Sequence, residues 1–233
     1  MPIVLRPEAA RLDPAVRGTL RRLAADPRVG LAVLSGRSLP DIRGRVAVRG
    51  ILYGGCHGLE IAGPGLRFSH PLARSLRSRI RIAAAALVDV AARFPGARVE
   101  RKGLGVAVHY RGVSAPRLPP LRGRVKQIAA RAGLTILPGK KVWDLLPPGH
   151  RGKGKAVGII RAHLEKRLGV RSSLTVYAGD DATDAEAFRS LGARGLAVQV
   201  GGRRGAAGYR LPGVHEVQAL LGWIARAVAS PPG

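Results

Sequence analysis

The chain has 233 residues, of which 46% are hydrophobic, so it can bury a sizeable core and is not disordered throughout. It has a single cysteine, Cys56, which excludes a scaffold held by disulfides within the chain. Lys and Arg number 40 against 14 Asp and Glu, giving a net charge of +26. Such a charge suits polyanions, but the arginines are dispersed and aromatic residues make up only 4%. Single-stranded nucleic-acid grooves combine basic with aromatic residues, so we expect no nucleic acid as a partner.

No stretch of the sequence predicts a membrane-spanning helix. The longest apolar block, Ile82–Val90, is interrupted by Asp89, whereas a spanning helix needs about 20 apolar residues. The first segment, Met1–Leu12, lacks the apolar centre of a signal peptide. We therefore expect a cytoplasmic protein with no membrane partner.

The first part of the chain predicts alternating helices and short strands. Asp13 and Pro14 form an N-cap followed by proline at the first helical position. The apolar run Val29–Leu34 predicts a buried strand, and a helix is expected near Leu39–Val46. Ile51–Tyr53 predicts another short strand.

A different pattern occupies the middle of the chain. We expect, in order, a long helix, a hairpin, a second helix and two further strands: Ala73–Phe94, Arg98–Arg101 with Leu104–Tyr110, a helix containing Leu121, Val125 and Ile128, and strands near Leu134–Leu137 and Lys141–Leu146. The order αββαββ predicts an antiparallel sheet with two helices on one face.

Alternation of helix and strand then returns. The expected elements are a helix, a buried strand, a helix, a strand and a final helix: Gly154–Leu168, Leu174–Ala178, Ala182–Leu191, Leu196–Val200 and Val217–Val228. We therefore predict an α/β protein whose parallel core, residues 1–57 and 149–233, is split by an α+β insert, residues 58–148.

Three short polar segments each follow an apolar strand: Ser35-Gly36-Arg37, Gly54 to His57, and Gly179 to Asp184. The carboxyl ends of strands form the ligand crevice of an open parallel sheet, so these segments are expected to converge. The third segment holds Asp180, Asp181 and Asp184 in a chain poor in acids. Carboxylates at a strand end suit Mg²⁺, although Asp181 or Thr183 could instead cap the next helix.

The other candidate residues are ambiguous when each is taken alone. Ser35 with the Gly36 amide suits a phosphoryl oxygen, or it caps an ordinary turn. Lys153 suits phosphate charge, or it belongs to a flexible basic turn. His57 is a ligand contact or a structural histidine. The hairpin residues Glu100, Lys102, His109 and Arg111 are, in isolation, ordinary strand residues.

Taken in order, these segments resemble the trehalose-6-phosphate phosphatases of the haloacid dehalogenase (HAD) superfamily. The matching segments are Pro2-Ile3-Val4, Leu34 to Arg37, Tyr53 to Glu60, Val99 to Lys102, Val108 to Arg111, Lys153 to Ala156, and Gly179 to Asp184 with Phe188. The resemblance implies a HAD-like Rossmannoid parallel-sheet core with an inserted αββαββ cap. It also implies Mg²⁺-dependent hydrolysis of trehalose 6-phosphate to trehalose and phosphate, in trehalose biosynthesis.

The resemblance further implies a role for each candidate residue. Ser35 and Lys153 would hold phosphate oxygens, and Asp180 would ligate Mg²⁺ together with Asp181, with Asp184 in support. The sugar would contact residues of the cap and its approaches: Arg37, His57, Glu100, Lys102, His109, Arg111 and Asp144. In the family an Asp nucleophile of a D-x-D-G-T motif attacks phosphorus, and a second Asp two positions later acts as acid and base.

The D-x-D-G-T motif does not occur in this sequence. In the family it ends the first strand, just upstream of the segment that Pro2-Ile3-Val4 resembles, so the catalytic Asp pair and the central strand are expected to be missing. One interpretation is an N-terminally truncated phosphatase, inactive as given. The alternatives are a sugar-phosphate-binding protein without catalysis, or another HAD sugar-phosphate phosphatase acting on a sucrose or mannosyl phosphate.

Overall fold

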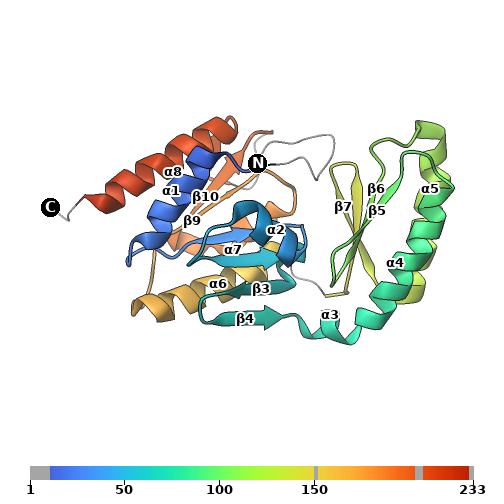
Figure 1. Ribbon diagram of the computed structural model, residues 1–233, viewed down its shortest axis with the longest axis horizontal. Helices are drawn as coiled ribbons and strands as arrows, with labels where there is room; N and C mark the ends of the chain where they lie inside the picture. Colours follow the sequence, from blue (N-terminus) through green and yellow to red (C-terminus); the bar gives the residue numbers. More distant parts are fainter. Residues whose placement is uncertain (1–10, 150–151, 203–206, 231–233) are drawn as a thin grey trace. The chain divides into compact units, whose positions relative to one another are not determined.

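The computed structural model describes residues 11–149, 152–202 and 207–230 (Figure 1). They form two compact units: a core unit, from the described residues within Met1–Ser35, Leu39–Arg67 and Arg151–Gly233, and a cap unit, from those within Gly36–Ser38 and Phe68–His150. The predicted cap began at residue 58, whereas the main segment of the cap unit begins at Phe68. The difference arises because β3 (Glu60–Gly63) pairs antiparallel with β2 (Leu52–Gly55) of the core unit.

Hydrogen bonds to side chains stabilise the start of the first helix and the end of the second helix of the core unit. Helix α1 (Pro14–Ala25) begins after Asp13, whose carboxylate accepts a hydrogen bond from the Ala15 amide at 2.7 Å. Helix α2 spans Leu39–Val46, and the Arg17 side chain of α1 donates to the Val46 carbonyl at 3.1 Å. An arginine that bonds the last carbonyls of a helix satisfies groups with no partner inside that helix.

The core unit contains two separate sheets with parallel pairs. In the first, β1 (Ala32–Leu34) pairs parallel with β2, and β3 and β4 (Leu66–Ser69) follow in the order β1-β2-β3-β4. In the second, β9, β10 and β11 lie in the order β11-β10-β9, all parallel: Thr175–Gly179, Gly195–Val200 and Tyr209–Leu211. The remaining helices of this unit are α6, α7 and α8: Gly152–Leu168, Asp184–Ser190 and Val214–Ala229.

The prediction that the strands at Val29–Leu34 and Leu174–Ala178 are buried was wrong. All three residues of β1 are half-buried, and the exposed fractions of Leu174 and Val176 are 68% and 39%. Among the residues that the structure describes, β1 and β9 each pair with a neighbour on one edge only. A strand at the edge of its sheet keeps part of its side chains within reach of water.

The cap unit has the predicted order of elements. Its helices are α3, α4 and α5, and its strands are β5, β6, β7 and β8: Pro71–Ser75, Arg77–Ala92, Leu118–Ala132, Arg98–Arg101, Val106–His109, Thr135–Gly139 and Val142–Leu146. The strands form one antiparallel sheet in the order β5-β6-β8-β7. The single long helix predicted over Ala73–Phe94 is instead interrupted at Leu76, where φ is −90° and ψ is 4°.

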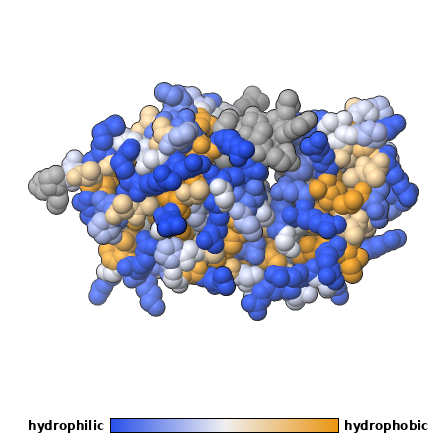
Figure 2. Space-filling view, in the orientation of Figure 1, coloured by the Kyte–Doolittle hydropathy of each residue, from blue (hydrophilic) through white to orange (hydrophobic). Residues whose placement is uncertain are grey.

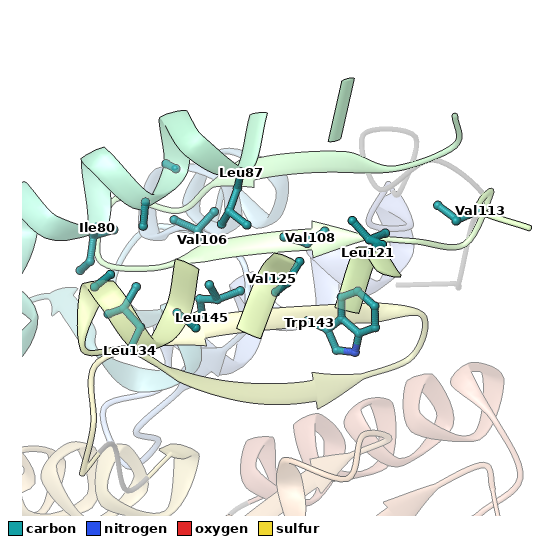
Figure 3. Close-up of a cluster of buried hydrophobic side chains, with 14 residues drawn as sticks. Ile80, Leu87, Val106, Val108, Val113, Leu121, Val125, Leu134, Trp143 and Leu145 are labelled. Carbon is teal, nitrogen blue, oxygen red and sulfur yellow. The ribbon is translucent and has the colours of Figure 1, made fainter. Parts of the chain in front are cut away.

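The hydrophobic core of the cap unit lies between its sheet and helices α4 and α5 (Figure 3). Helix α4 contributes Leu87 and α5 contributes Leu121, both about 1% exposed or less. Val106 and Val108 of β6 point into the same cluster, because alternate strand residues face the same side. Full burial of each such side chain contributes roughly 1.5–3 kcal/mol. No helix among the described residues is both long and apolar enough to cross a membrane.

Candidate active site

The ends of β1 and β2 bring Ser35 next to His57. The Ser35 amide donates to the Gly54 carbonyl at 2.9 Å, and the Ser35 carbonyl accepts from the His57 amide at 3.0 Å. Gly55 allows this arrangement, because a Cβ at that position would lie 2.4 Å from the Leu39 amide nitrogen of α2. Ser35 of the first predicted segment and His57 of the second therefore meet in the core unit.

His57 has an unusual backbone conformation. It is 5% exposed and has φ of 57°, and the preceding Cys56 has φ of 49°. A residue other than glycine in this region costs of order 1–3 kcal/mol and persists only where its surroundings fix it. Here Gly58 packs so closely on α6 that a Cβ would lie 2.5 Å from the Cβ of Ala156. The strained turn is thus held against the helix that carries Lys153.

Lys153 and Asp184 form a buried ion pair in the core unit. The Lys153 Nζ lies 2.6 Å from Asp184 Oδ1, and the exposed fractions of the two residues are 7% and 2%. Tyr177 of β9 donates its hydroxyl hydrogen to the same oxygen at 2.7 Å, and the Asp181 amide donates to Asp184 Oδ2 at 2.9 Å. Both carboxylate oxygens of Asp184 therefore accept hydrogen bonds from within the unit.

Glycine makes room for this pair. A Cβ on Gly179 would lie 2.3 Å from Asp184 Cγ, and one on Gly154 would lie 2.7 Å from the Glu186 carbonyl. Burial, followed by the charge of Asp184, raises the pKa of Tyr177 above its ordinary range, so its hydroxyl stays protonated as a donor. Sequence reasoning missed Tyr177. The available signal was the position of this tyrosine, two residues before Gly179 and close to three acids. A tyrosine hydroxyl that is removed from water needs a hydrogen-bond acceptor, and a carboxylate is one.

The remaining acids of the same segment are more accessible. Asp180 is exposed at the end of β9, and among the described residues nothing bonds to its carboxylate. Asp181 Oδ1 accepts from the Ala182 amide at 2.6 Å. Thr183 lies at the N-cap of α7, but its buried hydroxyl oxygen makes no hydrogen bond within the described chain. The proposed capping role of Thr183 is therefore not realised.

A metal site in this segment would be an open one. Within the described ranges, no group of three or more His, Cys, Asp or Glu side chains gathers as a metal cage. Mg²⁺ nevertheless requires only one or two carboxylates, because it keeps several of its waters. The exposed carboxylate of Asp180, with Asp181 beside it, fits that demand, whereas Asp184 is already engaged by Lys153 and Tyr177.

The second group of candidate residues lies on one face of the cap sheet. The strand register aligns Glu100 with Ala107 and Ala107 with Asp144, and His109 lies two residues along β6 from Ala107. This face is opposite to the one that packs on the helices, since Val106 and Val108 alternate with Ala107 and His109. Register also places Arg98, which sequence reasoning missed, opposite His109 on this face.

Two ion pairs organise the polar face of the cap sheet. Lys102 Nζ bonds Asp144 Oδ1, and the two residues are only 5% and 4% exposed. His109 Nε2 lies 2.9 Å from Glu100 Oε2, with both side chains partly exposed. Burial alone would raise the pKa of Glu100, but the hydrogen bond from His109 and the charge of Lys102 outweigh it and lower that pKa.

Two further predicted sugar contacts belong to the cap unit. Arg111 is exposed, and its guanidinium donates to the Lys140 carbonyl at 3.5 Å. Arg37 is half-buried in the short segment Gly36–Ser38, which belongs to the cap unit. The segment Pro2-Ile3-Val4, which carried part of the resemblance, lies outside the described residues.

Comparison with known proteins gives a consistent result. A family model described as trehalose-phosphatase matches residues 1–209. The trehalose-phosphate phosphatase of Mycobacterium tuberculosis (strain H37Rv) is 35% identical over 236 residues, which cover 99% of this chain and 60% of that protein. An uncharacterized glycosyl hydrolase of the same organism is 38% identical over 96% of this chain, but the match covers 17% of that protein. The chain thus spans only part of the length of these relatives.

Solved structures show the same fold. The crystal structure of a trehalose-6-phosphate phosphatase related protein has a TM-score of 0.84 at 26% identity, over 97% of this chain and 93% of that one. The C-terminal domain of the Candida albicans trehalose-6-phosphate phosphatase has a TM-score of 0.77 at 21% identity, over 97% and 88% of the two chains. The expected HAD-like α/β architecture with an inserted cap is confirmed.

Proposed function

Because the chain belongs to the trehalose-phosphatase family, we propose that it binds trehalose 6-phosphate and serves its Mg²⁺-dependent hydrolysis to trehalose and phosphate, in the cytoplasm and as a step of trehalose biosynthesis. The observation that carries the proposal is the buried Lys153–Asp184 pair of the core unit. A buried ammonium fixed by a carboxylate is a preorganised cation, and such a cation suits a phosphoryl group.

Each residue of the core unit has a distinct part in this proposal. Lys153 neutralises a phosphate oxygen, and Ser35 holds another. Asp184 positions the Lys153 ammonium and, through the Asp181 amide, the acidic segment. Asp180, with Asp181, would hold Mg²⁺. The metal, when bound, neutralises phosphate charge and aligns the group for displacement.

The cap unit supplies the sugar contacts in this proposal. Glu100, Lys102, His109 and Asp144 share one face of its sheet. The partly exposed His109 and Glu100 present a donor and an acceptor to sugar hydroxyls, and the Lys102–Asp144 pair is buried on the same face. Within each pair the two side chains hold each other in place, so little side-chain conformational entropy is lost when a ligand binds. Arg37 and Arg111 of the cap unit and His57 of the core unit complete the predicted set.

The covalent step requires an Asp nucleophile, and the family's D-x-D-G-T motif is missing from the 233 residues. We therefore expect these residues alone to bind trehalose 6-phosphate with negligible turnover, because positioning cannot replace the nucleophile. Under this proposal a functional phosphatase needs that motif in addition. A sugar-phosphate-binding protein without catalysis is the second candidate, and it is favoured by the same missing motif.

A ligand panel tests the proposal. Calorimetric titration of the chain with trehalose 6-phosphate, sucrose 6-phosphate and trehalose should show binding of the first, weaker binding of the second and weakest binding of the third. Phosphate release is measured in parallel with added Mg²⁺. Equal affinity for trehalose and its phosphate would contradict a phosphate site, and a preference for sucrose 6-phosphate would transfer the proposal to that substrate. Rapid phosphate release would disprove the need for the missing motif.

A further inference from the structure

An open hollow of about 830 Å³ lies in the core unit, away from the candidate active site. Its walls are the loop between α2 and β2, residues 47–51, and the turn between β3 and β4, residues 63–66. This loop enters β2 at its amino end, whereas Ser35 and His57 are tied to the carboxyl end of β2. The hollow and the candidate phosphate site are therefore at opposite ends of the same strand.

Three arginines line this hollow, and no acidic residue does. They are Arg43 of α2, Arg49 of the loop and Arg67 of β4. Within the residues that the structure describes, none of the three guanidinium groups forms an ion pair or a hydrogen bond. Other arginines nearby are engaged: Arg45 pairs with Asp41 at 2.8 Å, and Arg17 bonds carbonyls at the end of α2. Three exposed arginines thus line one shared concavity that has no acidic residue in its lining.

The walls of the hollow are fixed by hydrogen bonds. The hydroxyl of Tyr53 donates to the Val48 carbonyl at 2.7 Å and accepts from the Val48 amide at 3.0 Å, which pins the loop on β2. On the other side, His163 of α6 donates from Nε2 to the Pro64 carbonyl at 2.9 Å. Because both walls are held, the hollow exists before any ligand arrives, and binding incurs little cost of ordering.

The remaining lining is mostly apolar. Val48, Ile51 and Tyr53 belong to the buried cluster beneath the hollow and are each at most 4% exposed. A volume of about 830 Å³ lies within the range of roughly 300–1,000 Å³ typical of small-molecule sites. The surroundings therefore suit a small ligand with an anionic group.

We propose that this arginine hollow is a second ligand site, which binds a small molecule carrying a phosphate or diphosphate group. Guanidinium groups present paired N–H donors whose spacing matches phosphate oxygens, and several of them around one anion neutralise its charge. A bound anion also removes the mutual repulsion of the three arginines. The net charge of +26 cannot alone explain the site, because what distinguishes it is the shared, preformed concavity.

The test uses the full chain and inorganic pyrophosphate as the probe. Affinity is measured by calorimetry for the unmodified protein, for the pair Arg49→Gln and Arg67→Gln, and for a control pair, Arg122→Gln and Arg124→Gln. The control arginines are exposed on α5 of the cap unit, so both variants lose the same charge. We expect the first pair to weaken binding at least tenfold, about 1.4 kcal/mol, and the control pair less than twofold. Equal weakening by the two pairs would overturn the proposal.

Amide NMR gives a second readout that requires no substitution. Pyrophosphate should shift the amide resonances of Gly50 and Gly65, which belong to the two walls. If only residues near Lys153 shift, the anion occupies the candidate active site and the hollow is not a site. Adenosine monophosphate and inorganic phosphate are then compared: tighter binding of the nucleotide identifies a phosphorylated metabolite, and equal binding identifies the free anion. Either outcome leaves the phosphatase proposal untouched, because that proposal uses the other end of β2.

Discussion

The cap unit and the core unit bury their hydrophobic side chains in different ways. Within the described residues, one cluster of the cap unit has 14 buried hydrophobic residues, packed on one continuous sheet. The cluster of the core unit beside β1 and β2 has seven buried hydrophobic residues. The core unit is built on two sheets, and helix α8 has no buried residue among those described. Figure 2 shows hydrophobic residues among hydrophilic ones on one face of the molecule. The cap thus completes a hydrophobic core from its own αββαββ elements.

The candidate site residues are also divided between the two units. Each unit has a buried Lys–Asp pair: Lys102–Asp144 joins elements of one sheet region in the cap, and Lys153–Asp184 joins two helices in the core. In both, the lysine is fixed before a ligand binds. The comparison indicates that a preorganised cation requires local burial rather than a large surrounding core.

The largest effect is expected from the core ion pair. Replacing Asp184 by Ala leaves the Lys153 ammonium buried without a counter-charge, which costs roughly 3–5 kcal/mol. Chemical unfolding measures the loss of stability. The exposed neighbour Glu186, replaced by Ala, serves as the control and should cost less than about 1 kcal/mol. Similar losses for the two variants would mean that the pair contributes little to the core unit.

The difference in burial between the two units predicts that replacing a leucine by alanine costs more stability in the cap unit than in β1. Leu145→Ala in the cap should cost about 2–5 kcal/mol, because the side chain is 0% exposed and leaves a cavity. Leu34→Ala in the half-buried β1 should cost distinctly less. Urea unfolding followed separately in the two units gives both values. Equal costs would remove the distinction between a closed cap and a more open core.

A smaller effect is expected at Tyr177. Tyr177→Phe removes one hydrogen bond to Asp184 Oδ1 while the Lys153 bond to that oxygen remains. The expected loss is about 1–1.5 kcal/mol of stability. If Tyr177 positions Asp184 and thereby Lys153, phosphate affinity should also fall by several fold. A fall in stability with unchanged phosphate affinity would limit Tyr177 to a structural role.

The smallest effect concerns pH. The pKa of Glu100 is lowered in the folded chain, so its ionised form stabilises the fold above the unfolded-state pKa of about 4.3. That contribution is lost as pH falls through the lowered value. Glu100→Gln should therefore lower the cap's stability near neutrality and change it little in acid, which flattens the acid limb of the stability profile. An unchanged acid limb would mean that His109 and Lys102 do not stabilise the Glu100 carboxylate.

Much of the fold could be predicted because the relevant signals are local. Asp13-Pro14 marks the start of α1, and the order of elements in the cap follows from residue alternation. The hairpin of β3 and β4 was missed, although Pro64-Gly65 between two short apolar runs is a turn signal. The break at Leu76 carries no such signal, since neither Gly nor Pro is near it. Burial of β1 and β9 depends on neighbouring strands, which local sequence does not reveal.

The candidate site was predicted residue by residue, and its roles remain predictions. The structure brings Lys153 to Asp184, Lys102 to Asp144 and His109 to Glu100, which spacing alone could not have paired. Register, not sequence, places Arg98 opposite His109. Contacts between residues far apart in the chain depend on the tertiary fold, so a single sequence indicates their chemistry better than their partners.

We propose that the core unit recognises phosphate and the cap unit recognises the sugar. Calorimetry with trehalose 6-phosphate and with inorganic phosphate tests it on Lys153→Met and Glu100→Gln, with the exposed Lys155→Met as the control. We expect that Lys153→Met weakens the binding of both ligands, that Glu100→Gln weakens only that of trehalose 6-phosphate, and that Lys155→Met changes neither affinity. If Glu100→Gln leaves the affinity for trehalose 6-phosphate unchanged, the division of recognition between the two units is contradicted.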